Sequence, residues 1–157
     1  QEGSQQLAFN ALSVPQVAAL LATGNAVIAL MSLMLGRYWQ AALYNPGGFG
    51  DEFRAMGLPR QAVLIMAAAA TALWWMGPEW RVWSAVAVLP LTVIGFALAH
   101  AYAAKTGKGV TWLTLMYVVW IVLDPAKWLL VACVVIDAFV NFRAKWPAKT
   151  GTGSEDV

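Results

Sequence analysis

Apolar residues fill most of this chain, and short polar or glycine-rich segments divide them into long stretches. About 20 apolar residues in a helix cross the ~30 Å hydrocarbon core of a bilayer, so these stretches are typical of membrane spans. The pattern predicts an all-α fold, a polytopic transmembrane helix bundle with about five spanning helices. The expected helices of this transmembrane domain (14–142) cover residues 14–36, 58–76, 81–103, 111–123 and 125–142.

The last two helices are expected to come from one apolar run, residues 110–142. A single helix of that length would extend ~50 Å, and it would place Asp124 and Lys127 at membrane depth. Asp124-Pro125 is a typical helix start, because an N-cap residue is followed by a proline in the first turn. We therefore expect a break at Asp124, although the helix before it is short for a span.

The longest polar and aromatic interruption is the loop at residues 37–57. Its start, Arg37-Tyr38-Trp39, is typical of the membrane interface. Residues 40–44 are expected to continue as helix along the membrane surface. Asn45-Pro46-Gly47-Gly48 predicts a turn, and residues 51–56 predict a short amphipathic helical turn.

Five spans would divide the basic residues unequally between the two sides of the membrane. Eight fall on the side of the loop, namely Arg37, Arg54, Arg60, Lys105, Lys108, Arg143, Lys145 and Lys149, and two fall on the other side, namely Arg81 and Lys127. Four spans with one long last helix would give five against four. Cytoplasmic loops carry an excess of Lys and Arg. We therefore expect the loop 37–57 and the tail 143–157 to be cytoplasmic and residues 1–13 to be non-cytoplasmic.

Composition excludes several classes of protein. The chain is 61% hydrophobic and 11% charged, whereas roughly 25% charged residues are usual in soluble domains. A very apolar soluble helical bundle is the alternative, but a chain of this size could not bury so much apolar surface in one core. The net charge of +2, without a basic patch interleaved with aromatic residues, does not indicate nucleic-acid binding.

Sequence motifs do not indicate an enzyme. The glycines of the loop are not followed by the Lys-Ser/Thr of a phosphate-binding loop, and neither a nucleophile elbow nor a zincin motif occurs. One cysteine and one histidine exclude an internal disulfide and a multi-histidine metal site within this chain, and no cofactor is expected. Because the chain begins at Gln1 and residues 1–13 do not resemble a signal peptide, we expect further sequence before them in the gene product.

Asp137 is the most informative polar residue inside the predicted spans. A carboxylate at a helix centre costs about 2.5–3.5 kcal/mol, and less near an interface, so it should have a partner. We expect Asp137 to pair with Arg37 or His100, which lie at the same predicted depth, and so to hold the loop on the bundle. Alternatively, Asp137 reaches interfacial water, or Asp137 and His100 bind substrate or relay protons. Asn25, at mid-depth, is expected to bond to another helix.

The candidate structural or partner-binding residues lie in the loop and in this polar layer, where Asn141 shares the face of Asp137. They are Arg37, Tyr38, Trp39, Tyr44, Asn45, Pro46, Gly47, Gly48, Phe49, His100, Asp137 and Asn141.

The string from Arg37 to Phe49, followed by Glu52-Phe53 and Leu58-Pro59, resembles the C-terminal half of the YybS-like family of bacterial polytopic membrane proteins. The ending from Val134 to Arg143 is similar to the last helix of that family. The resemblance implies a polytopic protein of the bacterial inner membrane with roughly eight helices, longer than this chain. With the charge distribution above, residues 1–13 are then expected on the periplasmic side. A suggested kinship of the family with the substrate-capturing components of energy-coupling-factor transporters is fold-level analogy.

Two functions remain open at this point. Few ionisable groups lie inside the predicted spans, and the loop is rich in aromatic residues and glycine, which favours a structural or accessory subunit of a larger membrane assembly. The alternative is a small-molecule transport component, which rests on the family analogy and on Asp137 and His100. A transport component should contain a polar cavity reachable from one side, whereas an accessory subunit should contact another chain. The expected partners are the lipid bilayer and another membrane protein.

Overall fold

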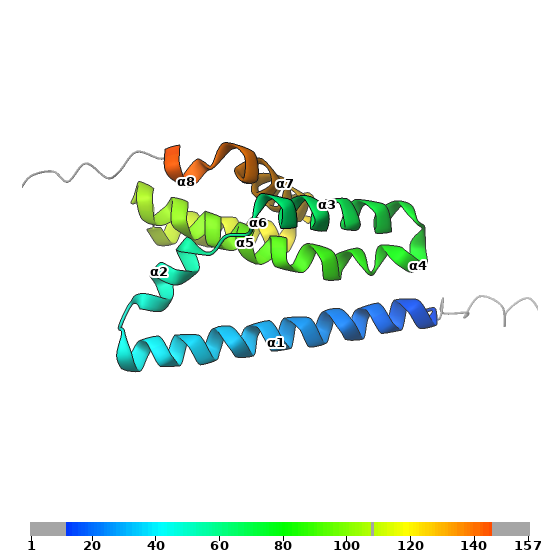
Figure 1. Cartoon of the computed structure of the whole chain (residues 1–157), viewed down its shortest axis with the longest axis horizontal. Helices are drawn as coiled ribbons and strands as arrows, with labels where there is room; N and C mark the ends of the chain where they lie inside the picture. Colours follow the sequence, from blue (N-terminus) through cyan, green and yellow to red (C-terminus); the bar gives the residue numbers. More distant parts are fainter. Residues whose placement is uncertain (1–11, 108, 146–157) are drawn as a thin grey trace, which may run out of the picture.

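The computed structural model describes residues 12–107 and 109–145, and within these ranges all regular secondary structure is helical (Figure 1). The expected all-α fold class is therefore confirmed. Most of the predicted N-terminal segment 1–13 and of the tail 143–157 lies outside the described residues, as do Lys108 and Lys149. In chain order the helices are α1 (Val14–Tyr44), α2 (Gly48–Ala55), α3 (Arg60–Trp75), α4 (Pro78–Arg81), α5 (Ser84–Thr106), α6 (Gly109–Val122), α7 (Asp124–Val140) and α8 (Phe142–Lys145).

The first helix, α1, begins where the sequence predicts and ends later. The backbone N–H of Ser13 donates to the side-chain oxygen of Gln16 at 2.9 Å, and Pro15 lies in the first turn. Figure 1 shows α1 as one helix, so residues 40–44 extend it in line instead of turning onto a separate path. After Pro15 in the first turn no proline occurs before Asn45, which itself precedes a proline and is therefore disfavoured in the helical conformation. The 31 residues of α1 reach about 46 Å.

The expected break near Asp124 is confirmed. The chain bends by 119° between α6 and α7. The N-cap is Leu123 rather than Asp124, and Asp124 and Pro125 occupy the first turn of α7. Lys127 Nζ donates to Asp124 Oδ1 at 2.7 Å, which places a charged pair at this turn.

Two helical segments are long and apolar enough to cross a membrane on their own. They are α1 and the stretch Pro78–Thr106, which joins α4 and α5. The bent pairs α2–α3, with 69° between them, and α6–α7 raise the number to four if each pair is one span. The five spans expected from the sequence are therefore not confirmed. The reason is length, because α6 has 14 residues and α7 has 17, which is about 21 Å and 25 Å of helix.

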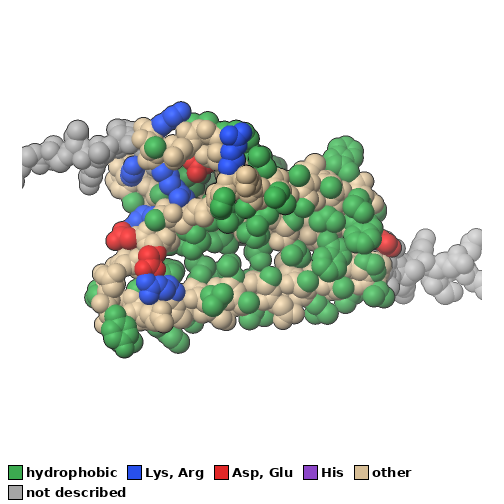
Figure 2. All heavy atoms as spheres, viewed as in Figure 1, with side chains coloured by type: hydrophobic (Ala, Val, Ile, Leu, Met, Phe, Trp, Pro, Cys, Tyr) green, Lys and Arg blue, Asp and Glu red, His purple; other side chains and the backbone are tan. Residues whose placement is uncertain are grey.

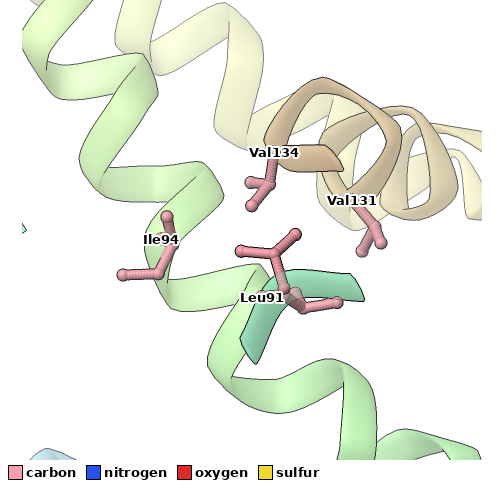
Figure 3. Close-up of a cluster of buried hydrophobic side chains, with 5 residues drawn as sticks. Leu91, Ile94, Val131 and Val134 are labelled. Atoms are coloured by element: carbon pink, nitrogen blue, oxygen red, sulfur yellow. The ribbon is translucent and has the colours of Figure 1, made fainter. Parts of the chain in front are cut away.

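The core lies where α3, α5 and α7 meet. Figure 3 shows Leu91 and Ile94 of α5 beside Val131 and Val134 of α7, and Val63 of α3 completes the buried cluster. Leu91 is fully buried. Figure 1 shows α1 alongside this core, and only two of its residues, Ala19 and Ala41, are buried.

Gly95 allows α5 and α7 to approach each other closely. A Cβ atom on Gly95 would lie 2.5 Å from Leu130 Cγ. A glycine without a Cβ lets a large side chain of the neighbouring helix sit against the backbone, as is common between membrane helices.

Charged side chains gather at one end of the molecule, the end that carries α2 and α8 (Figure 2). Lys105 Nζ, near the end of α5, donates to Arg143 O at 2.9 Å. Arg143 donates in turn to the backbone oxygens of Ala55, at 3.3 Å, and of Met56, at 2.8 Å. We call this the charged end.

The opposite end is defined by tryptophan contacts, and we call it the tryptophan end. The rings of Trp74 in α3 and Trp128 in α7 lie 5.3 Å apart, nearly perpendicular. The Arg81 guanidinium lies 4.5 Å from the centre of the Trp74 ring. The turn between α3 and α4 and the turn between α6 and α7 therefore meet at the same end of the bundle.

Candidate functional site

An ion pair holds α2 against the end of α1. Arg37 Nε donates to Glu52 Oε2 at 2.7 Å, and Arg37 Nη2 donates to Glu52 Oε1. Two parallel bonds from a guanidinium to a carboxylate fix orientation as well as distance. The hydrogen bonds from Arg37 hold the pKa of the Glu52 carboxyl below its ordinary value. Both side chains are about half exposed, so the pair positions α2 more than it stabilises the fold.

The turn between α1 and α2 explains the glycines of the candidate set. The N–H of Asn45 donates to Ala41 O at 2.8 Å and ends α1. Gly47 has φ of 89°, in the left-handed region that favours glycine. Gly48 is buried, and a Cβ atom there would overlap the side chain of Asn45. The turn predicted at residues 45–48 is confirmed, and Pro46 lies in it, exposed.

Aromatic rings connect this turn to the centre of the bundle. Tyr38 contacts Phe49 with ring centres 5.9 Å apart, and Phe49 stacks on Phe53 at 6.2 Å. Phe53 meets His100 of α5 at 5.3 Å, and His100 meets Tyr117 of α6 at 5.8 Å. We call these five residues the ring series. Aromatic pairs of this geometry add about 0.5–1.5 kcal/mol each beyond burial.

His100 has its hydrogen bonds within the bundle. Its Nδ1 lies 2.8 Å from Phe96 O, and because a carbonyl only accepts, Nδ1 carries the proton and donates. In the neutral ring Nε2 is then an acceptor, and the Tyr117 hydroxyl lies 3.4 Å from it. His100 therefore joins α5 to α6 and the ring series, and it does not contact Asp137.

Asp137 ends α7 instead of pairing with a loop residue. Its Oδ1 accepts from the backbone N–H of Phe142 at 2.7 Å. Asn141 has a positive φ of 50°, and its N–H donates to Asp137 O at 2.8 Å. The expected pairing of Asp137 with Arg37 or His100 is thus wrong. Arg37 is already taken by Glu52, and the turn after α7 brings a closer backbone donor to Asp137.

A polar cavity lies at the charged end, between the start of α3 and the end of α7. Its volume is about 250 Å³, and its polar lining includes Arg60, Asp137, Asn141 and Arg143. Core residues such as Val63 form its apolar wall. Arg60 and Asn141 are exposed, so the cavity is reachable from the surface at this end.

A larger apolar pocket lies on the other side of α7, within the angle between α6 and α7. It has a volume of about 560 Å³ and is lined by Gly95, Trp112, Leu130 and Cys133 among others. Hydrocarbon chains fit such a lining. In the described part of the chain no group of three or more His, Cys, Asp or Glu side chains could hold a metal ion.

Of the predicted residues, Asn45, Gly47 and Gly48 form the turn between α1 and α2. The structure divides the others into three groups. The first group contacts or belongs to α2 and consists of Arg37, Tyr38, Phe49 and His100. The second group lines the polar cavity and consists of Asp137 and Asn141. The residues Trp39, Tyr44 and Pro46 are exposed, as an interfacial or partner-binding role requires.

Sequence reasoning missed several residues of these sites. They are Glu52 and Phe53 of α2, Tyr117 of α6, and the two arginines of the polar cavity, Arg60 and Arg143. The arginines entered the sequence analysis only as topology markers. The complementary charge of Arg37 and Glu52 within one short loop was a usable signal, whereas nothing in the spacing of His100 and Tyr117 indicates their contact.

Comparison with known proteins finds no matching family model, no matching curated protein and no matching solved structure. The resemblance to the YybS-like family therefore stays a prediction.

Proposed function

We propose that this chain is a structural or accessory subunit of a larger assembly in the bacterial inner membrane, and that it docks a transmembrane helix of another protein on the outer face of α1. In this proposal the chain crosses the membrane five times, and the charged end is cytoplasmic. The long apolar helices and the gathering of basic residues at one end support this orientation.

Four small residues and Asn25 line one exposed face of α1. From Ala18 to Gly36 these residues are seven, four, three and four positions apart, which keeps them on one side of a helix. Small residues let two membrane helices approach closely, and a Cβ atom on Gly36 would meet nothing within 4 Å. The residues of this outer face, all exposed, are Ala18, Asn25, Ala29, Ser32 and Gly36.

Asn25 is the single observation that carries the proposal. It is an exposed amide near the middle of the apolar part of α1, and Asn25 Nδ2 donates to Leu21 O of its own helix at 2.9 Å. Its amide oxygen has no hydrogen bond to the described residues. In hydrocarbon an unpaired polar group is costly, and a polar side chain of a neighbouring helix would satisfy it.

The test is capture of a partner in mild detergent, combined with cross-linking from Ser32→Cys in a Cys133→Ala background. We expect a stoichiometric membrane protein that cross-links to position 32 and is lost in Asn25→Leu. Thr71→Val is the matched control, because Thr71 is also exposed and also bonds to its own helix, through Ala67 O at 2.8 Å. It should keep the partner. Cross-linking only to a second copy of this chain, or retention in Asn25→Leu, would contradict the proposal.

A small-molecule transport component is the second candidate. The polar cavity favours it, because a transport component needs a polar site reachable from one side of the membrane. Mass spectrometry of small molecules extracted from the purified protein separates the two candidates. A bound metabolite without a partner protein favours transport.

A further inference from the structure

We propose that the polar cavity at the charged end binds a phosphate monoester group, which is held by Arg60 and Arg143 and donates a hydrogen bond from its O–H to Asp137. The group belongs either to a soluble phosphate compound or to the headgroup of phosphatidic acid. This inference is independent of helix docking on α1. It supplies a ligand class for the second candidate function, and its test measures binding alone, apart from partner capture and from transport.

The charges of the cavity are not neutralised by ion pairs. Among the described residues the ion pairs are Arg37–Glu52, Arg54–Asp51 and Lys127–Asp124. The two guanidinium groups and one carboxylate of the cavity therefore leave a net positive site. An anion that enters it gains charge-assisted hydrogen bonds without displacing an existing ion pair.

Both guanidinium groups are held in place by other contacts. The Arg60 guanidinium lies 4.0 Å from the centre of the Phe139 ring, and a guanidinium stacked on a ring keeps its N–H edge available. Arg143 donates to Ala55 O and Met56 O, and each terminal nitrogen of a guanidinium carries a second N–H. Donors held in this way lose little side-chain entropy on binding.

Asp137 selects among anions. One of its oxygens accepts from Phe142 N–H, and the other has no hydrogen bond to the described residues. A phosphate monoester, with a second pKa of about 6, carries an O–H for part of the time near neutral pH. It can donate to Asp137 while its other oxygens accept from the arginines. Sulfate and carboxylate ligands only accept, so Asp137 repels them.

The size of the cavity suits this ligand. Its volume of about 250 Å³ corresponds to about eight water molecules at ~30 Å³ each. A phosphate group fits with part of the organic group that it carries.

The test is calorimetric binding to the whole chain purified in a neutral detergent at pH near 6.5, the range in which the ligand titrates. The probes are inorganic phosphate, sulfate, and dioctanoyl phosphatidic acid with dioctanoylglycerol as its uncharged control. We expect phosphate to bind at least roughly tenfold more tightly than sulfate. Binding of inorganic phosphate assigns a soluble ligand, and binding of phosphatidic acid alone assigns the lipid headgroup.

Three variants decide the outcome. Arg60→Gln should weaken phosphate or phosphatidic acid binding roughly tenfold or more, whereas Arg54→Gln, at the same end but outside the cavity, should leave it unchanged. Asp137→Asn keeps an oxygen for Phe142 N–H, and it should remove the preference for phosphate by improving sulfate binding. If Asp137 had only a structural role, Asp137→Asn would leave the ratio of phosphate affinity to sulfate affinity unchanged. Absence of binding by both phosphate probes, or binding unaffected by Arg60→Gln, would overturn the proposal.

Discussion

Glu52 shows how one exposed residue positions a whole segment. In the sequence its charge makes it a candidate partner for Arg37, but the same is true of Asp51 beside it. In the structure its carboxylate receives two bonds from Arg37, and α2 is thereby held against the end of α1. The ring series then connects α2 to His100 of α5 and Tyr117 of α6. The negative charge of Glu52 contributes to this contact because its partner, Arg37, is positively charged.

The Arg37–Glu52 pair predicts a dependence of stability on pH. Since the pKa of Glu52 is lowered in the folded protein from 4.5, the pair stabilises the fold above that unfolded value, and this contribution is lost as pH falls through the lower folded pKa. Thermal unfolding in detergent should show Glu52→Gln less stable than the wild type at about pH 7, with the difference shrinking as pH falls below 4.5. Asp51→Asn is the control, because Asp51 pairs with Arg54 and, among the described residues, not with Arg37. If the stability difference between Glu52→Gln and the wild type stayed the same as pH falls, the charge of Glu52 would not be involved.

At the scale of helices, the breaks are what the sequence predicts best. Prolines and glycines act locally, so Asn45-Pro46-Gly47-Gly48 marks the end of α1 and Asp124-Pro125 marks the start of α7 without reference to the rest of the fold. The length of α1 was underestimated, since Arg37 and Trp39 indicate a membrane interface and not a helix end.

Contacts between helices were beyond the reach of the sequence. The sequence predicts a side-chain partner for Asp137, Arg37 or His100, whereas its actual donor is the backbone N–H of Phe142, and a backbone donor exists at every residue other than proline. Arg60 and Arg143 lie 83 positions apart (143 − 60), so the polar cavity exists only once α3 and α7 pack together. Sequence spacing carries information within a helix and loses it between helices.

Close packing of α5 against α7 gives a prediction at this scale. Gly95→Ala places a Cβ atom 2.5 Å from Leu130 Cγ, which forces the helices apart or displaces the leucine. Overpacking of this kind typically costs about 1–3 kcal/mol, so the free energy of unfolding in detergent should fall by that amount. Gly24→Ala is the matched control, because a Cβ atom there meets nothing within 4 Å. Equal stability of both variants would mean that Leu130 moves aside freely.

At the scale of the whole molecule, both ends of the α6–α7 pair return to the charged end. Lys105, just before α6, bonds to the backbone of Arg143, just after α7. The turn between the two helices reaches the tryptophan end, where Trp128 contacts Trp74. A pair that leaves one end, reaches the other and comes back passes the bundle twice. The five spans that we propose require this path for α6–α7, together with one crossing each by α1, α3 and α5.

That topology predicts which residues can be reached from outside the cell. In a Cys133→Ala background, a membrane-impermeant maleimide applied to intact spheroplasts should label Lys127→Cys, which lies at the turn between α6 and α7. Arg81→Cys, at the same end of the bundle, is the positive control, and Lys105→Cys should be labelled only after permeabilisation. If α6 and α7 instead form a re-entrant loop, Arg81→Cys would be labelled and Lys127→Cys would not. If Lys105→Cys alone were labelled in intact spheroplasts, the protein would have the orientation opposite to the one proposed. The excess of basic residues would then face outward, against the charge rule.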